Sequence, residues 1–178
     1  MNPGATAAAV RPRVLLTGCH GRLGQHLLPV LVPDCDVLGV GVEEASFVHD
    51  PAFRYQQMQD PATAAWLKLA AEFRPTAVLN AAAYTQVDLA EQEREACWRS
   101  NVDLVRSLLA ICRVHGAWLG QVSTDYVFDG LKGPYAPTDP PLARGVYARS
   151  KLAAENVVRG SGIPAAIVAA VSGSSTGV

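Results

Sequence analysis

The chain has few charged residues and almost no net charge. Charged residues make up 17% of its 178 residues, and 15 Lys and Arg stand against 16 Asp and Glu, for a formal net charge of −1. Proteins that hold nucleic acid by its phosphates carry a clear basic excess, so this composition argues against general nucleic-acid binding. Hydrophobic residues make up 49%, which suffices for the core of one domain and excludes a globally disordered chain.

Long apolar runs are also missing. Every apolar run is short and is broken by Gly, Pro or a charged residue, so the sequence predicts no transmembrane helix and no membrane partner. The first 12 residues lack both a charged start and a long apolar stretch. We interpret residues 1–12 as a flexible N-terminal tail rather than a signal peptide.

The cysteines and histidines show no metal-ligand spacing. None of the four Cys forms a CxxC pair, and the four His form no HExxH motif. We therefore expect no metal site, and four reduced thiols in a cytoplasmic protein.

Segments typical of strands and of helices alternate along the chain. Short apolar runs predict buried strands at 13–17, 36–40, 76–80, 117–122 and 165–170. Helical spacing and capping residues predict helices at 22–31, 60–73, within 88–115 and at 147–158. This alternation predicts an α/β fold: a Rossmann-like, doubly wound parallel sheet with helices on both faces, over residues 13–171.

The last segment, residues 172–178, is rich in Gly and Ser and directly follows a predicted strand. Such an end is typical of a linker or a cut. We therefore expect a C-terminally truncated, incomplete domain. The unpaired strand at 165–170 would then leave an apolar edge through which the chain associates, a homodimer being one form of this.

A glycine-rich segment, Thr17–Gly24, separates the first predicted strand from the first predicted helix. Gly18 permits a sharp turn, Gly21 lets the backbone approach a diphosphate, and Gly24 lets helix and strand pack closely. The N-terminus of the following helix offers free N–H groups to phosphates. The first gap is one residue longer than in the usual dinucleotide fingerprint, and an ordinary glycine turn is the alternative.

The end of the second predicted strand bears on cofactor choice. Dinucleotide-binding folds often place an acid there to bind the ribose 2′-hydroxyl, and the expected position is Gly41, with Glu43 and Glu44 just beyond. Arg22 in the glycine loop could face a 2′-phosphate, although it could also be an ordinary surface charge. These features favour NADPH, with NADH as a second cofactor.

Tyr147 and Lys151 form a YxxxK motif on a predicted helix, so that both share one face. A lysine ammonium there would lower the pKa of the phenol, and the tyrosine would protonate a carbonyl oxygen as hydride reaches its carbon. Two strand ends carry further candidates. Ser123 or Thr124 could hydrogen-bond a substrate carbonyl, and the small residues 81–83 would let a cofactor lie against the backbone.

Three strings carry a family resemblance: residues 80–91 (NAAAYTQVDLAE), 123–130 (STDYVFDG) and 147–152 (YARSKL). Over residues 13–168 the chain resembles the extended short-chain dehydrogenase/reductases, and among them the dTDP-4-dehydrorhamnose reductase family. The resemblance implies an oxidoreductase of nucleotide-sugar and carbohydrate biosynthesis. Its reaction would be the NADPH-dependent reduction of the 4-keto group of dTDP-4-dehydro-6-deoxy-L-mannose to dTDP-L-rhamnose.

The resemblance also implies roles for individual residues. Thr124, Tyr147 and Lys151 match the catalytic trio, Thr124 and Asp125 match positions near the sugar, and Asn101 falls where related enzymes carry a supporting asparagine; a structural asparagine is the alternative. With the glycine loop, the expected cofactor contacts are Gly18, Gly21, Arg22, Leu23, Gly24, Asp60, Ala82, Ala83, Tyr84, Tyr147 and Lys151.

The chain departs from this family after its last predicted strand. The family has an Arg and a substrate-site Trp where this sequence has residues 169–173 (AAVSG), and then a C-terminal lobe that grips the nucleotide sugar. Without that lobe we expect weak NADPH binding and no measurable reduction by this chain alone.

Two alternatives stay open beside the reductase. One is a non-catalytic, NADP-binding regulatory subunit, because the resemblance extends to the β subunits of methionine adenosyltransferases; the other is a truncated product without function. Thr124 and the string at 83–88 (AYTQVD) favour the reductase.

Overall fold

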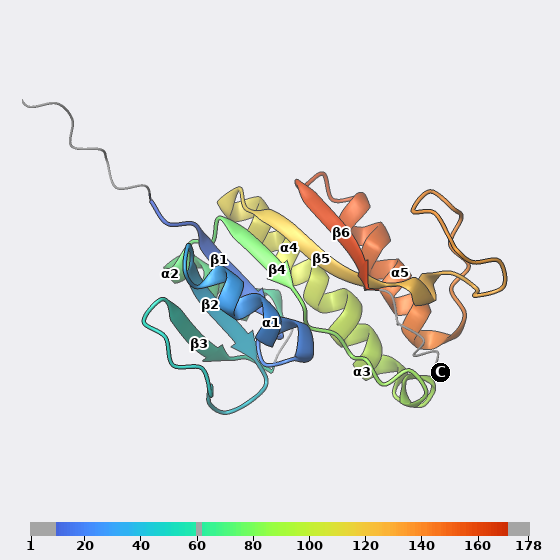
Figure 1. The fold of residues 1–178 in the computed structure, drawn as a ribbon, viewed down its shortest axis with the longest axis horizontal. Helices are drawn as coiled ribbons and strands as arrows, with labels where there is room; N and C mark the ends of the chain where they lie inside the picture. Colours follow the sequence, from blue (N-terminus) through green and yellow to red (C-terminus); the bar gives the residue numbers. More distant parts are fainter. Residues whose placement is uncertain (1–9, 60–61, 171–178) are drawn as a thin grey trace, which may run out of the picture.

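The computed structural model describes residues 10–59 and 62–170, and they form a six-stranded parallel sheet (Figure 1). The strand order is β3-β2-β1-β4-β5-β6. The strands are β1 (Arg13–Thr17), β2 (Asp36–Gly41), β3 (Phe53–Gln57), β4 (Ala77–Asn80), β5 (Trp118–Thr124) and β6 (Ala165–Ala170). The chain winds first to one side of β1 and then to the other, so β1 and β4 flank the switch point where ligands bind in such sheets.

Helices cover both faces of this sheet, as predicted. They are α1 (Arg22–Leu31), α2 (Thr63–Phe73), α3 (Arg94–Trp98), α4 (Leu104–His115) and α5 (Gly145–Arg159), with short turns at η1 (Leu89–Glu91), η2 (Arg99–Asp103) and η3 (Asp125–Val127). Helix α1 lies on one face, and α2, α4 and α5 lie on the other (Figure 1).

Two apolar clusters explain why both faces need helices. Leu15 and Leu16 of β1 are both fully buried. Because successive side chains of a strand point to opposite faces, Leu15 packs among residues of α2, α4 and α5, whereas Leu16 packs with Leu28 of α1. A strand that is buried on both sides reads as a continuous apolar run, and this is why β1 could be predicted.

The prediction missed strand β3. Its sequence, FRYQQ, is polar on one face, and only Phe53 is buried. As an edge strand it pairs with β2 alone, so it lacks the apolar run by which the central strands were found.

The predicted helical segment 88–115 is divided into four elements. A π-helical turn, η2, joins α3 to α4, and Gly116 caps the end of α4 with a φ of 66°, in the left-handed region that favours glycine. Helix α2 begins at Thr63, and the predicted start at Asp60 and Pro61 lies outside the described residues. Helix α5 begins two residues before the predicted Tyr147.

Strand β6 is the other edge of the sheet and is largely exposed. Trp118 of β5 and Val168 of β6 are 40% and 61% exposed. Their neighbours Leu119 and Ile167 pack toward α4 and α5, so by alternation Trp118 and Val168 lie on the face that carries α1.

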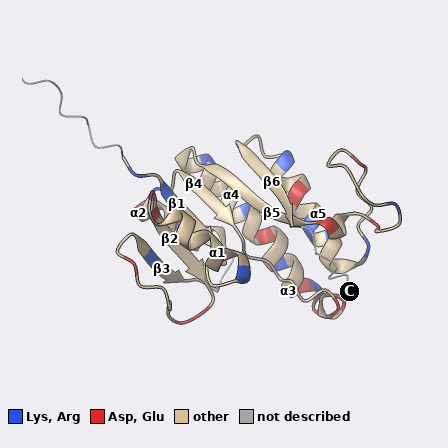
Figure 2. Ribbon diagram, viewed as in Figure 1, with Lys and Arg blue, Asp and Glu red and all other residues tan. Residues whose placement is uncertain are grey.

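Residues of opposite charge are interspersed along the helices and loops (Figure 2). Within residues 10–59 and 62–170, no helix is long and apolar enough to cross a membrane.

Candidate active site

A cavity of about 440 Å³ lies at the carboxyl ends of β1, β2 and β4. This is the edge of the sheet where the switch point predicts a ligand. Its lining comprises Thr17, Gly18, His20, Gly21, Arg22, Val40, Gly41, Val42, Glu43, Met58, Gln59, Trp66, Ala81, Ala82, Ala83, Thr85, Arg99, Ser100 and Leu104.

The glycine loop forms one wall of this cavity, and its geometry requires glycine. Gly18 has a φ of 67°, and a Cβ there would lie 2.7 Å from the backbone N of Ala82. A Cβ on Gly24 would lie 2.2 Å from the carbonyl oxygen of Gly18. Gly21 is the N-cap of α1 and has no side chain to cap the first N–H groups of the helix. The glycine loop and the N-terminus of α1 together form a cradle of uncovered backbone N–H groups. This cradle fits the diphosphate of a dinucleotide, which accepts hydrogen bonds from such groups.

A buried polar ladder crosses three strands beside the cavity. Thr17 Oγ1 donates to Asn80 Oδ1 at 2.6 Å, and Asn80 Nδ2 donates to Gln121 Oε1 at 2.8 Å. Asn80 Oδ1 also accepts from the backbone N–H of Ala82 at 3.2 Å. These bonds satisfy buried polar groups and fix the loop that follows β4, with its small residues 81–83, against β1.

Asn101 joins this loop to helix α5. It lies in the π-helical turn and is 2% exposed. Its Oδ1 accepts from the N–H of Tyr84 at 2.9 Å, and its Nδ2 donates to Ser150 Oγ at 2.9 Å. Ser150 Oγ in turn donates to the carbonyl oxygen of Tyr147 at 2.7 Å. Asn101 therefore sets the position of the loop after β4, residues 81–84, relative to helix α5, which carries the YxxxK motif.

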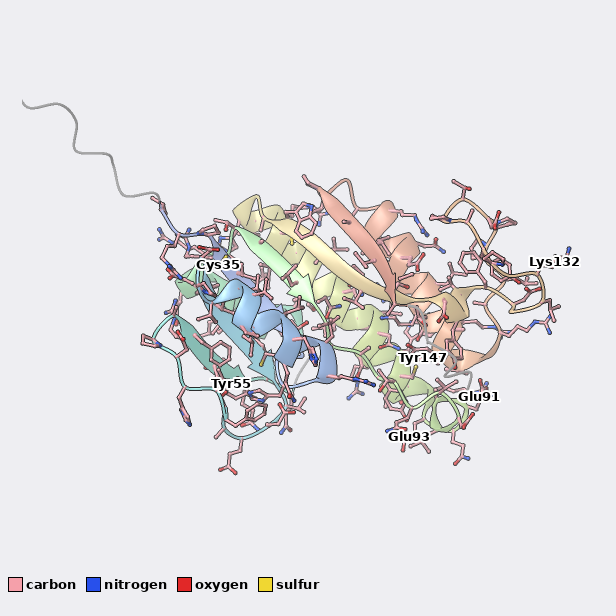
Figure 3. The ribbon with its side chains drawn as sticks, viewed as in Figure 1. Cys35, Tyr55, Glu91, Glu93, Lys132 and Tyr147 are labelled. Atoms are coloured by element: carbon pink, nitrogen blue, oxygen red, sulfur yellow. The ribbon has the colours of Figure 1, made fainter. Side chains whose placement is uncertain are left out.

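Tyr147 is buried at the start of α5, packed with Tyr84 and Cys97. Its ring makes an edge contact with Tyr126 at 5.9 Å between centroids. Figure 3 shows it at the same end of the molecule as Glu91, which accepts from the N–H of Val146 at 2.6 Å.

The pKa of Tyr147 corrects one sequence expectation. Burial raises this pKa above its ordinary value, and a hydrogen bond with Thr124 lowers it in part. The expected lowering by Lys151 is absent, because the Lys151 ammonium points to the backbone and donates to the carbonyl oxygen of Val122 at 2.7 Å. A phenol with a raised pKa keeps its proton and suits the role of an acid.

Lys151 is a buried cation, 3% exposed. Burial lowers its pKa to about 8, and the carboxylate of Glu155 opposes this shift. Glu155 is itself buried, accepts from Ser123 Oγ, and pairs with Arg159 at 2.8 Å.

We expect Lys151→Met to stabilise the chain at pH 7 by about 2–3 kcal/mol, because it removes a charge whose burial the fold opposes. Below about pH 8 Lys151 keeps its proton in both the folded and the unfolded chain, so the full free-energy cost of burying its charge is present. Between pH 8 and about 10.5 the unfolded chain binds more protons, so the wild-type free energy of unfolding rises toward that of the variant. Urea unfolding from pH 7 to 10, with exposed Lys68→Met as the control, measures this; a constant difference across that range would contradict it.

Thr124 ends β5 and caps the short turn η3. Its Oγ1 accepts from the N–H of Tyr126 at 3.3 Å and donates to Asp125 Oδ1 at 3.2 Å. Thr124 is 6% exposed. The side chains of Thr124 and Tyr147 are joined by a hydrogen bond.

The predicted site residues fall into three groups. Five of the expected cofactor residues line the cavity: Gly18, Gly21, Arg22, Ala82 and Ala83. Leu23, Gly24 and Tyr84 belong to the neighbouring loop and helix but are not part of the lining. The trio is not part of the lining either: Thr124 ends β5, the strand next to β4, and Tyr147 and Lys151 lie on α5. Asp60 lies outside the described residues.

Sequence reasoning missed several lining residues, among them His20, Gln59, Thr85, Arg99 and Ser100. Arg99 and Ser100 enter the cavity through the π-helical turn, which no pattern in the sequence indicates. His20 stands inside the glycine motif and could have been noticed there.

Comparisons with known proteins agree with this geometry. Residues 12–173 match the model of the family described as RmlD substrate binding domain. A dTDP-4-dehydrorhamnose reductase of Streptomyces griseus is 40% identical over 83% of this chain and 45% of its own length. Methionine adenosyltransferase 2 subunit beta of Xenopus tropicalis is 33% identical over 82% of this chain and 42% of its own.

A solved structure of a reductase with the same name is also similar to this chain. The dTDP-4-dehydrorhamnose reductase of Bacillus anthracis in complex with NADP has a TM-score of 0.77 and is 28% identical, over 91% of this chain and 54% of that one. The chain spans about half the length of the curated relatives it matches. The resemblance seen in the sequence is confirmed, and the chain belongs to the RmlD substrate binding domain family.

Proposed function

We propose that the protein is an NADPH-dependent reductase that converts the 4-keto group of dTDP-4-dehydro-6-deoxy-L-mannose to the alcohol of dTDP-L-rhamnose. The observation that carries this proposal is the link through Asn101, which connects the loop beside the dinucleotide cradle to the helix of Tyr147 and Lys151. Relatives named for this reaction support the choice of substrate.

Each residue of the trio has a distinct task in this reaction. A bound nicotinamide supplies hydride to the carbonyl carbon. Thr124 donates a hydrogen bond to the carbonyl oxygen, and Tyr147 gives that oxygen its proton, so that ketone, hydride and proton balance as an alcohol. Lys151 lies one turn after Tyr147. Its ammonium donates to the carbonyl oxygen of Val122, and one of its two remaining N–H groups is the proposed donor to the cofactor ribose.

Cofactor choice rests on Arg22, which is exposed and lines the cavity at the N-terminus of α1. Within the described chain, no carboxylate forms an ion pair with it, so its guanidinium is available to a 2′-phosphate. NADPH is therefore the proposed cofactor, with NADH accepted as well.

Arg22→Ala should weaken NADPH binding by roughly 1.5–3 kcal/mol, the usual worth of a charge-assisted hydrogen bond, and leave NADH binding nearly unchanged. Calorimetry with both cofactors on wild type and variant measures this difference. Equal losses for the two cofactors would show that Arg22 does not contact the phosphate.

The cellular setting is part of the same proposal. All four cysteines lie within the described residues and are free, which supports the cytoplasm as the compartment.

A regulatory subunit is the second candidate, and the similarity to a methionine adenosyltransferase β subunit favours it. Such a protein would bind NADPH without reducing a sugar. To distinguish the reductase from the regulatory subunit, the protein expressed from its full reading frame is assayed for NADPH oxidation in the presence of the dTDP-keto sugar. Oxidation that depends on the sugar supports the reductase. Tight NADPH binding without oxidation, together with co-purification of a methionine adenosyltransferase, supports the regulatory subunit.

A further inference from the structure

Helix α5 is joined to the end of β5 by hydrogen bonds from three consecutive strand residues (Figure 1). Residues 122, 123 and 124 of β5 bond to Lys151, Glu155 and Tyr147, respectively. These three partners are spaced four residues apart, so they share one face of α5. Tyr147 and Lys151 belong to the proposed catalytic trio, whereas the proposed reaction gives no task to Glu155.

Glu155 is a buried carboxylate, 4% exposed, and both of its oxygens are engaged. Its Oε1 accepts from Ser123 Oγ, and its Oε2 lies 2.8 Å from Nη2 of Arg159. Ser123 is 3% exposed and, like Leu119, lies on the face of the sheet that packs against α5. A buried charge is costly unless it is paired and hydrogen-bonded. These two partners therefore hold the carboxylate of Glu155 in one place behind the end of β5.

Lys151 lies one turn before Glu155 and is also buried. Burial lowers the pKa of Lys151 to about 8, and the carboxylate of Glu155 opposes this shift. Cys97 of α3 acts in the same direction as Glu155 but to a smaller extent. An ammonium that has lost its hydration depends on nearby negative charge to stay protonated. Glu155 is therefore the main group that keeps Lys151 a cation.

The other charged or titratable groups on elements that pack against α5 are Glu91 of η1, Arg94 and Glu95 of α3, Arg99 and Asp103 of η2, Arg106, Cys112, Arg113 and His115 of α4, and Asp125 and Tyr126 of η3. Several are paired among themselves, as Asp103 is with Arg106 at 2.7 Å. Within residues 10–59 and 62–170, the groups that act on the charge of Lys151 are Glu155 and Cys97.

We propose that Glu155 is a positioning residue of the active site: with Ser123 it fixes the face of α5 that carries Lys151, and its charge keeps Lys151 an ammonium. An ammonium has three N–H groups, and the carbonyl oxygen of Val122 takes one of them, so two remain for the hydroxyl groups of the cofactor ribose. A neutral amine would keep only one. This inference rests on the proposed function, which assigns Lys151 to the ribose.

Glu155→Gln removes the charge but keeps the size of the side chain and the acceptor for Ser123. We expect it to lower the pKa of Lys151 by about one pH unit. Arg159→Gln should raise that pKa by about half a pH unit, because it removes the cation that offsets Glu155. Arg159 is 54% exposed, so this variant tests the coupling without disturbing the core. Arg149→Gln is the matched control, since this arginine is exposed on the opposite side of α5, and its effect should stay within about 0.2 pH unit.

NMR of protein labelled with ¹³C at lysine Cε measures these shifts without relying on activity. The chain has three lysines. Lys68 and Lys132 are exposed, and the signal that is lost in Lys151→Met identifies Lys151. If Lys151 titrates at the same pH in wild type, Glu155→Gln and Arg159→Gln, the inference is wrong.

Calorimetric titration with NADPH at pH 6 and pH 8 connects this charge to the cofactor. When the ammonium is the form that binds the ribose, the apparent Kd rises as the charged fraction falls. The Kd of Glu155→Gln should therefore exceed that of wild type by about fivefold at pH 8 and agree with it within about twofold at pH 6. A purely structural role would weaken binding equally at both pH values and would contradict the inference.

The outcomes separate this inference from the proposed function. If wild type binds NADPH and Glu155→Gln changes its affinity equally at pH 6 and pH 8, or not at all, the inference is wrong and the proposed function stands. If wild type binds neither NADPH nor NADH, the proposed function fails and this inference fails with it.

Discussion

Tyr147→Phe is expected to lower the rate of keto-sugar reduction by about 10²–10⁴, the usual scale for loss of a general acid. The variant keeps the ring that packs against Tyr84 and Tyr126 and loses only the phenolic proton. Cofactor affinity should therefore hardly change. The assay uses the full length of the protein's own reading frame, because positioning of the sugar contributes much of such a rate.

Tyr126→Phe is the matched control for this experiment. Its ring lies 5.9 Å from that of Tyr147 and is 45% exposed, so it samples the same surroundings without the proposed role. The control should retain the wild-type rate within a few-fold. Wild-type turnover in Tyr147→Phe would show that another group supplies the proton, and the regulatory candidate would gain.

Gly24→Ala is expected to destabilise the fold by about 2–4 kcal/mol and to abolish dinucleotide binding. The added Cβ would lie 2.2 Å from the carbonyl oxygen of Gly18 and 2.6 Å from Cys19 Cα. Both are backbone atoms, so relief requires α1 to move away from the loop that it positions.

Gly160→Ala is the milder comparison, because Gly160 has an ordinary φ of −79° and its Cβ would lie 3.3 Å from the carbonyl oxygen of Asn156, a contact that a shift of a few tenths of an ångström relieves. Its stability should stay within about 1 kcal/mol of wild type. Urea unfolding and NADPH titration measure both effects. A Gly24→Ala variant as stable as the control would contradict the close packing of helix and loop.

The central part of the fold could be predicted from the sequence because its strands are buried on both faces. Leu15, Leu16 and Val37 are fully buried and form apolar runs that a single sequence shows. Strand β3 is an edge strand with one polar face, and the π-helical turn at 99–103 packs against α5, where Asn101 donates to Ser150. Such features arise from tertiary contacts and leave no local pattern.

The parts of the candidate site that require a particular residue type could be predicted from the sequence. The parts that depend on which side chains come close together in space were harder to predict. Gly18 and Gly24 follow from the turn and the close packing that only glycine allows. The orientation of Lys151 toward a carbonyl group, and the return of Glu43 to the space beside Gly41, depend on how loops fold back. The orientation of Lys151 overturned the expected lowering of the Tyr147 pKa. The return of Glu43 places a carboxylate beside Gly41, a position at which the sequence itself has no acid.

The most direct test of the reductase follows the transferred hydrogen. The protein, expressed from its full reading frame, is incubated with the dTDP-4-keto sugar and NADPH that carries deuterium at the transferable position of C4. The account predicts dTDP-rhamnose with a single deuterium at C4 of the sugar, formed by wild type and, at a greatly reduced rate, by Tyr147→Phe. Unchanged keto sugar after incubation with protein that binds NADPH tightly would contradict it.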